Sequence, residues 1–356
     1  MLGQQQFLNV SGLQNAGGLS AVAADSTFYQ KRFKIKELVV NAFSFLKNNM
    51  VPGQPVPPAI QAFYHGTLRV LNVIKQDFPD FLSDFHFNFV NSLPDHCIQM
   101  RNLILAAYPS QIQQPDPFCK NLKIDLLTEI KQSPRILSNY GNYLSLMNLR
   151  EDLENYTRTR NPQLIADICR KMEQSEETVN GRRRINSNVI SAVVLFIANW
   201  KTNQRNAENQ RDEHREARDI FKQIVKTLDD ETRLCFLNAI INELRYPNNH
   251  TFYFSCIILY IYAEADRESI NEQISAIFLE RLQTSGPYPW GLMISFRELI
   301  QIPKFQFMKR HYIRSHPQAI TRLFQGQLRN FMDFVPTALR GQLLQGNTSP
   351  APEVPN

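Results

Sequence analysis

Two local groupings of acid, imidazole and thiol side chains come closest to a catalytic or metal-binding pattern. Asp95, His96 and Cys97 are consecutive, and neighbours in sequence do not face one another on a helix. A catalytic cysteine and histidine normally meet from distant segments, so we interpret this tripeptide as a helix N-terminus. His250 and Cys256 are six residues apart, which is a poor spacing for two ligands of one metal ion on one helix face.

A third grouping is a row of carboxylates. Asp77, Asp80 and Asp84 could share a helix face and offer oxygen ligands to a cation. The same segment is crowded with aromatic residues, which favours a core helix with a solvated acidic edge: Phe78, Phe81, Phe85, Phe87 and Phe89. Nucleotide loops of the GxGxxG type, the GxSxG elbow and HExxH are all absent from the sequence. We therefore predict no enzyme, no cofactor and no metal site.

Basic side chains are the more informative feature. The chain has 39 Lys and Arg against 33 Asp and Glu, a net charge of +6. Residues 301–330 hold six basic residues and no acid. The charge of this segment therefore equals the net charge of the whole chain. Such a segment is either a solvated helix face or a patch that binds RNA phosphates or an acidic partner. The candidate patch consists of Lys304, Lys309, Arg310, Arg314 and Arg322.

A polar and aromatic turn lies at residues 242–251, with the sequence NELRYPNNHT. Side chains such as Arg245 and Asn248 can close a tight turn by bonding to neighbouring backbone groups. The alternative is an exposed edge that binds a partner. The residues alone favour the closed turn.

The elements that carry these residues are predicted to be helices. Apolar residues recur at helical spacing, as in residues 234–244, and prolines separate stretches long enough for one helix each. The 42-residue interval from Pro247 to Pro289 holds two such stretches, with a break near Ala265, close to the HEAT period of about 40–47 residues. We predict an all-α fold, an irregular HEAT-type α-solenoid of about twelve to fifteen helices. A compact globular helical domain is the alternative.

The chain divides into three parts by composition. Residues 1–25 predict a flexible leader, residues 26–335 a helical domain, and residues 336–356 a disordered tail. The helical domain could consist of two lobes that meet near residues 175–205. No hairpin is predicted, because the Asn180-Gly181 pair precedes an arginine run and not a β-branched one.

The composition argues against a membrane-spanning protein and against a secreted, disulfide-bonded protein. The longest apolar runs are about a dozen residues, too short for a membrane span of about 20. The chain has five cysteines without a CxxC pair, which argues for a reducing compartment.

Several ordered blocks resemble one known family. The blocks lie at 78–109 (FPDFLSDFHFNFVNSLPDHCIQMRNLILAAYP), 115–137 (PDPFCKNLKIDLLTEIKQSPRIL), 234–265, 274–292 and 296–307. Together they closely resemble the C-terminal domain of the large scaffold subunit, Not-one, of the CCR–NOT mRNA deadenylase complex. The resemblance covers roughly residues 30 to 325.

The resemblance implies a HEAT-type helical array without an active site. Such a domain docks the heterodimer of Not-box subunits, the second with the third (or, in yeast, fifth), and so supports mRNA deadenylation, mRNA decay and translational repression. Recruited repressors of Nanos type are further partners of the family domain. The implied location is the cytoplasm, including P-bodies, and the nucleus. The alternative function is RNA binding through the basic segment at 301–330.

Seven residues are our candidates for partner contacts, because aromatic and apolar anchors carry most of the binding energy at interfaces. They are Arg245, Tyr246, Asn248, His250, Tyr253, Trp290 and Phe296. Two segments look diverged from the family pattern, Lys201–Arg218 and Lys309–Arg314, so partner contacts of relatives are not carried over to them.

Overall fold

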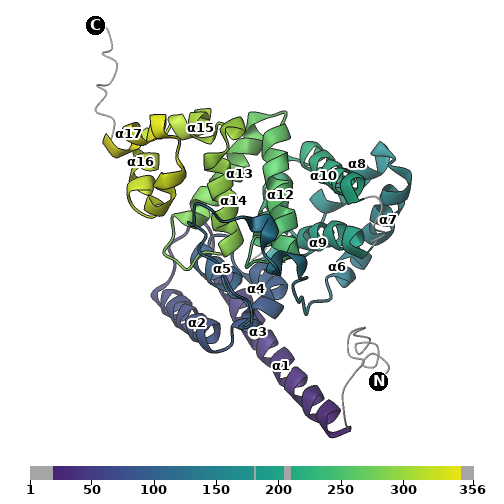
Figure 1. The fold of residues 1–356 in the computed structure, drawn as a ribbon. Helices are drawn as coiled ribbons and strands as arrows, with labels where there is room; N and C mark the ends of the chain where they lie inside the picture. Colours follow the sequence, from purple (N-terminus) through teal and green to yellow (C-terminus); the bar gives the residue numbers. More distant parts are fainter. Residues whose placement is uncertain (1–18, 180–181, 204–209, 346–356) are drawn as a thin grey trace.

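The structure is a computed structural model, and it describes residues 19–179, 182–203 and 210–345. Helices stack side by side, with α7–α8 at one end of the array, α12–α14 in the middle and α15–α17 at the other end, while α1–α5 pack below the middle (Figure 1). The described part of the chain contains no helix that is both long and apolar enough to span a membrane. The predicted all-α, solenoid-like fold is confirmed.

The N-terminal part builds the first apolar core from five helices. They are α1 (Leu19–Asn49), α2 (Pro58–Asp77), α3 (Pro79–Asp84), α4 (His86–Ser92) and α5 (Ile98–Leu105). Prolines start α2 and α3 at the position where a missing N–H costs nothing. Phe81, Phe85 and Phe89 pack against one another in this core, as the phenylalanine-rich sequence predicts.

A long irregular segment, residues 108–140, then crosses the molecule; we call it the crossing segment. It contains two short 3-10 helices, η2 (Ile124–Leu126) and η3 (Glu129–Lys131). Its backbone is tied down at both ends. Trp290 Nε1 donates to the carbonyl of Pro115 at 2.8 Å, and the Leu137 amide donates to the carbonyl of Asp84 at 2.9 Å.

The remaining elements, except β1, share one continuous second core. They are α6 (Gly141–Leu146), α7 (Leu149–Thr159), α8 (Pro162–Glu173), β1 (Glu176–Val179), β2 (Arg182–Ile185), α9 (Ser187–Asn203), α10 (Gln210–Thr227), α11 (Asp230–Asn242), α12 (Asn249–Glu264), α13 (Glu268–Leu282), α14 (Trp290–Gln301), η4 (Pro303–Phe305), η5 (Phe307–Lys309), α15 (His311–Arg314), α16 (Pro317–Gln325), η6 (Arg329–Phe334) and α17 (Thr337–Gln345). The interval from Pro247 to Pro289 holds two helices, α12 and α13, and α12 ends at Glu264, next to the predicted break near Ala265.

The predicted absence of a hairpin was wrong. β1 and β2 pair antiparallel, with Val179 opposite Arg182, and the Asn-Gly pair between them lies outside the described residues. Asn-Gly is the preferred sequence of a two-residue hairpin turn. The arginines suit the second strand because Glu177 lies opposite Arg184, and opposite charges on facing residues stabilise a strand pair.

The predicted domain boundaries also differ from the structure. α1 begins at Leu19 and α17 extends to Gln345, so helix reaches beyond both predicted ends, 26 and 335. The alanine-rich sequence that follows Gly18 has high helix propensity. The rest of the predicted leader, residues 1–18, and of the predicted tail, residues 346–356, lies outside the described residues.

The two predicted lobes near 175–205 are not separate. Helices α8, α9 and α10, on both sides of that region, contribute to the same core. The division between cores falls earlier in the chain, where α4 lies between them. Phe85, which precedes α4, and Phe89 of α4 enter the first core, whereas Phe87 of α4 enters the second.

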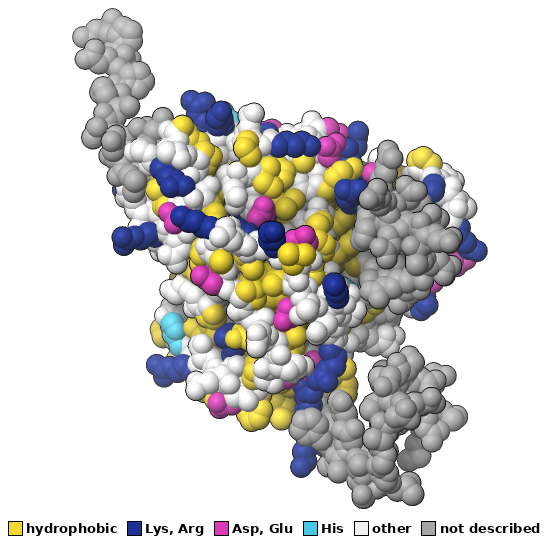
Figure 2. Space-filling view, in the orientation of Figure 1, with side chains coloured by type: hydrophobic (Ala, Val, Ile, Leu, Met, Phe, Trp, Pro, Cys, Tyr) yellow, Lys and Arg dark blue, Asp and Glu magenta, His cyan; other side chains and the backbone are white. Residues whose placement is uncertain are grey.

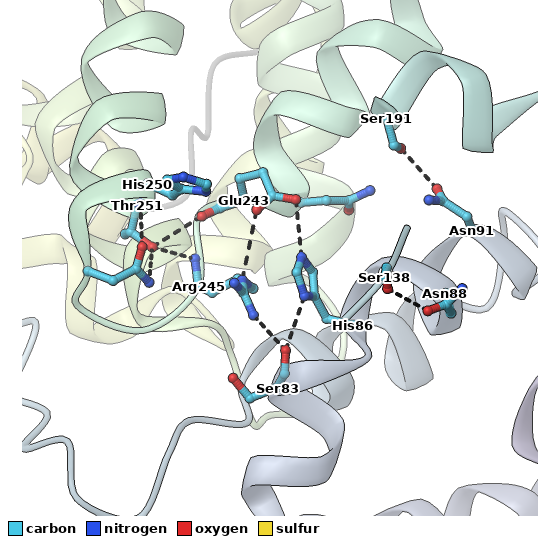
Figure 3. Close-up of polar contacts among 12 residues, drawn as sticks. Ser83, His86, Asn88, Asn91, Ser138, Ser191, Glu243, Arg245, His250 and Thr251 are labelled. Carbon is cyan, nitrogen blue, oxygen red and sulfur yellow. Dashed lines mark hydrogen bonds and ion pairs between the residues drawn. The ribbon is translucent and has the colours of Figure 1, made fainter. Parts of the chain in front are cut away.

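Buried polar side chains connect α3 and α4 to the turn between α11 and α12 (Figure 3). The carbonyl oxygen of Ser83 accepts from Arg245 Nη1 and from His86 Nδ1, both at 3.1 Å. His86 Nε2 lies 3.2 Å from Glu243 Oε1. We call Ser83, His86, Glu243 and Arg245 the junction network; all four are buried.

The turn itself is closed by its own side chains. Asn248 caps α12, since its Oδ1 accepts from the Thr251 amide at 3.0 Å, and its Nδ2 donates to the carbonyl of Tyr246 at 2.7 Å. Thr251 Oγ1 accepts from the Arg245 amide at 3.1 Å. The closed-turn interpretation of residues 242–251 is therefore confirmed.

Burial and charge set the protonation of this region. Burial raises the pKa of Glu243, but His86 and Arg245 outweigh it and bring the pKa down to about 2. Burial lowers the pKa of His250 from 6.5 to about 4, with Arg245 acting in the same direction against Glu243. Burial and Arg245 likewise lower the pKa of His86. All three groups bind protons less readily in the folded chain than in the unfolded one.

We predict that acid destabilises the fold through these groups. Because the pKa of His250 falls from 6.5 to about 4 on folding, the free energy of unfolding should decrease as pH falls from about 6.5 toward 4, by up to about 1.4 kcal/mol per pH unit for this group. Urea unfolding at a series of pH values measures the slope. His250→Gln should flatten it, whereas His65→Gln, at an exposed position, should not. Equal slopes in the two variants would contradict the assignment.

A second prediction concerns the contact between α14 and the turn. The Gly291 amide donates to the carbonyl of Arg245 at 2.6 Å. A Cβ on Gly291 would lie 2.8 Å from the backbone carbon of Leu244 and would also collide with the Thr251 methyl group. Gly291→Ala should therefore lower the free energy of unfolding by about 1–3 kcal/mol.

The control for this prediction is Gly66 in α2, around which a Cβ meets no atom within 4 Å. Gly66→Ala should stabilise the chain by about 0.5–1 kcal/mol, because alanine restricts the unfolded backbone. Thermal and urea unfolding of both variants test the pair. A Gly291→Ala protein as stable as the parent would refute the close packing.

Candidate docking surface

The structure places six of the seven predicted partner-contact residues in the interior, which is a correction to the sequence analysis. They are Arg245, Tyr246, Asn248, His250, Trp290 and Phe296. Tyr253 is half-buried. The physical reason is that polar and aromatic groups at this density satisfy one another inside the fold. The buried six are therefore not available as surface contacts in this conformation.

Two of these residues illustrate the interior role. The Trp290 indole is 1% exposed and holds the crossing segment through Pro115. The Phe296 ring lies in an aromatic cluster, 5.1 Å from the ring of Phe331 and 5.5 Å from that of Phe307. Both residues support the surface elements by packing in the interior.

The predicted basic patch is divided by ion pairs. Lys304 Nζ lies 3.5 Å from Glu264, and Arg310 Nη1 lies 2.9 Å from Glu268. Within the described residues, the other three members of the patch form no ion pair, and all three are exposed: Lys309, Arg314 and Arg322. Glu264 belongs to α12 and Glu268 to α13. These two helices therefore neutralise part of the positive charge of a segment that contains no acidic residue of its own.

An exposed apolar stripe runs along α12. Phe252, Cys256, Leu259 and Ala263 follow the spacing i, i+4, i+7, i+11, which puts them on one helix face. Phe252 is 37% exposed, Cys256 is exposed, and Leu259 and Ala263 are half-buried. We call these four residues the α12 stripe. Hydrophobic side chains gather in the middle of the molecular face where Figure 1 places α12 (Figure 2).

The crossing segment borders the start of this stripe. η3 packs against α12, and the Asn249 amide donates to the carbonyl of Gln132 at 2.9 Å. Leu126, at the end of η2, is 67% exposed. The surface thus combines a helix face with an extended segment of the same chain.

The far end of the stripe is bordered by charges of both signs. Tyr260 Oη donates to Asp219 Oδ1 at 3.1 Å, and the Arg218 guanidinium lies 5.1 Å from the centre of the tyrosine ring. Lys222 of α10 lies 3.6 Å from Glu264. An apolar centre with a mixed polar rim is the usual anatomy of a protein–protein interface.

The reactive groups of the sequence analysis lie apart. Cys97 is the residue immediately before α5, which agrees with the predicted helix N-terminus. Burial raises the pKa of the Cys97, Cys169 and Cys235 thiols to about 12, so these thiols are weak nucleophiles. Asp84 forms ion pairs with Arg32 and Arg135. Among the described residues, no three His, Cys, Asp or Glu side chains are arranged to hold a metal ion.

The α12 stripe was missed by sequence reasoning, although a signal was present. Phe254, Ile257, Ile258 and Ile261 follow the helical spacing i, i+3, i+4, i+7, and this stripe is buried. The remaining apolar residues of the same helix form a second stripe at the same period. When a helix has two apolar faces and the core buries only one, the other face is available to a binding partner.

The chain matches the family model described as CCR4-Not complex component, Not1, over residues 28–327. It is 36% identical over 296 residues to the CCR4-NOT transcription complex subunit let-711 of Caenorhabditis elegans, which covers 81% of this chain and 11% of the relative. It is 31% identical over 267 residues to the general negative regulator of transcription subunit 1 of Schizosaccharomyces pombe, which covers 73% and 12%. The chain thus spans about a tenth of the length of these curated relatives.

Two solved structures share the fold. The NOT1 superfamily homology domain from Chaetomium thermophilum superposes with a TM-score of 0.75 at 27% identity, covering 84% of this chain and 60% of that one. A Not1 C-terminal domain in complex with Not4 superposes with a TM-score of 0.66 at 23% identity, covering 80% and 58%. By the family match and the identity to these relatives, the chain belongs to the Not1 family of CCR4-Not complex components.

Proposed function

We propose that this chain is a non-enzymatic scaffold module that docks other Not subunits of the CCR4-NOT complex on the α12 stripe and the adjoining crossing segment. The observation that carries the proposal is an exposed apolar helix face on a member of the Not1 family. A solenoid offers such faces and the grooves between its helices to extended or helical segments of a partner.

The partner we assign is the Not-box heterodimer of the second and the third or fifth Not subunits. A solved Not1 C-terminal domain bound to Not4 supports the view that Not subunits meet domains of this fold. Through this docking the module would support mRNA deadenylation, mRNA decay and translational repression, in the cytoplasm, including P-bodies, and in the nucleus. Repressors of Nanos type would be further partners.

The binding energy should come mainly from apolar anchors. Burying a phenylalanine or leucine side chain stabilises a complex by about 1.5–3 kcal/mol, whereas exposed ion pairs contribute about 0–1 kcal/mol each. The charges at the far end of the stripe are already paired within the chain. We therefore expect a complex that is only weakly sensitive to salt.

The first test is co-purification of the chain with the Not-box heterodimer, sized by light scattering at about 0.15 M and about 0.5 M salt. We expect a one-to-one-to-one complex at both salt concentrations. Phe252→Glu or Leu259→Glu should weaken binding by about 2 kcal/mol or more, roughly thirtyfold in Kd, because each buries a charge at the apolar centre.

The matched control is Leu146→Glu on α6, because Leu146 is 75% exposed and lies outside the stripe. Circular dichroism and thermal unfolding establish that all three variants are folded. A complex that tolerates both stripe substitutions, or that is lost equally with Leu146→Glu, would overturn the assignment of the surface.

RNA binding through the basic segment is the second candidate, favoured by the three exposed, unpaired members of the patch. Each phosphate contact to single-stranded RNA contributes a slope of about −0.7 in log K against log salt, so three contacts give about −2. Fluorescence anisotropy with an oligouridylate measures this slope. Combining Lys309→Glu with Arg314→Glu should reduce both affinity and slope, while the heterodimer complex stays intact. RNA affinity that is unchanged by the double variant would contradict this candidate.

A further inference from the structure

The outer surface of α1 and α2 exposes apolar side chains that the proposed function does not use. Leu38 of α1 is 68% exposed, and Val70 and Val73 of α2 are each more than half exposed. A group of exposed apolar side chains marks an interaction site.

Three exposed apolar residues of α1 form one stripe together with the half-buried Ala42. Ile35, Leu38, Ala42 and Phe45 follow the spacing i, i+3, i+7, i+10, so they share a face of about 80°. Next to this stripe lie Phe43 and Leu46, which are fully buried in the first core. The apolar surface of α1 is therefore wider than the part that is covered within the described residues.

The exposed residues of α2 form a second stripe with small residues in it. Ala59, Phe63, Gly66, Val70 and Val73 lie on its outer face, and all are exposed. A Cβ at Gly66 meets no atom within 4 Å, so the surface there is open. Small side chains allow the backbone of another helix to approach closely.

The two stripes meet to form one surface, which we call the α1–α2 face. The rings of Phe45 and Phe63 contact edge to face with their centres 5.0 Å apart. The helices run antiparallel from this contact, because a short loop joins them. Hydrophobic side chains also reach the surface at the lower edge of Figure 2, where Figure 1 places these helices.

Basic side chains border this face. Lys31 and Lys34 precede Leu38 by seven and four residues on α1, which places them on the same side of the helix. Arg69 lies beside Val70 on α2. All three are exposed, and within the described part of the chain none forms an ion pair with an acidic residue.

We propose that the α1–α2 face docks an amphipathic α-helix of a partner protein whose apolar stripe is bordered by acidic side chains. The face offers two apolar stripes on antiparallel helices, which matches the packing of a third helix against a helix pair. The uncompensated lysines and arginine select for acidic flanks on that helix. This proposal does not depend on the α12 stripe or on its partner.

A membrane surface fits less well. Interfacial segments insert bulky Trp, Phe and Leu side chains, whereas the outer stripe of α2 carries Ala59, Gly66, Val70 and Val73 beside a single phenylalanine, Phe63.

The test uses the full chain and two synthetic helical peptides of about 20 residues. Both carry the same leucine stripe; one has glutamates along its borders and the other has lysines. Fluorescence anisotropy measures binding. We expect the glutamate peptide to bind at least about tenfold more tightly than the lysine peptide. Leu38→Glu or Val70→Glu should weaken binding about tenfold or more, and Lys34→Glu should reduce the preference for glutamate.

The control variant is Leu234→Glu on α11, at a position 38% exposed and outside the face; its binding should equal that of the parent. Four outcomes would overturn the proposal. These are equal affinity for the two peptides, no binding of either, binding that is insensitive to Leu38→Glu, or light-scattering evidence that the face is occupied by a second copy of the chain. Binding to anionic vesicles that is lost in Leu38→Glu, without peptide binding, would assign the face to a membrane and would also overturn it.

Discussion

The carbonyl oxygen of Ser83 accepts hydrogen bonds from both Arg245 and His86, and His86 in turn reaches Glu243. These groups lie between the two apolar cores, where an unpaired charge would cost several kcal/mol. The rest of the array depends on this pairing. The paired groups hold the turn at residues 242–251, and this turn sets the orientation of α12 relative to α11. α14 is fixed to the same turn through Gly291, which has no room for a side chain.

This arrangement places polar groups inside and leaves apolar groups outside. The 242–251 turn is rich in the polar and aromatic residues that are common at interfaces. Its side chains, however, form hydrogen bonds within the turn and to α3 and α4. The surfaces left for partners are faces of helices whose other sides are already buried, the α12 stripe and the α1–α2 face. A scaffold needs this second apolar face, because a helix with a single stripe has nothing apolar left after the core is formed.

Helical periodicity and proline spacing were sufficient to predict the fold class and the pairing of α12 with α13, because both depend on local sequence. The hairpin was missed because the arginine run outweighed the Asn-Gly turn signal, although an arginine can be placed on a strand opposite Glu177. The lobe boundary was misplaced because contacts of α8 with α10 are distant in sequence. The candidate contacts failed for a related reason: Trp290 and Arg245 look like surface anchors until their partners, Pro115 and Ser83, are brought beside them.

The central claim, that the α12 stripe is the docking surface, is tested most directly by the reactivity of Cys256. This thiol lies on the stripe and is exposed, and a Leu146→Cys variant supplies a reference thiol at a position that is 75% exposed and outside the proposed surface. Maleimide modification followed by peptide mass spectrometry gives both rates, for this variant alone and with the Not-box heterodimer. Our account predicts that the heterodimer slows modification of Cys256 and leaves the rate of the reference thiol unchanged. A stable complex in which Cys256 reacts as fast as in the free chain would contradict it.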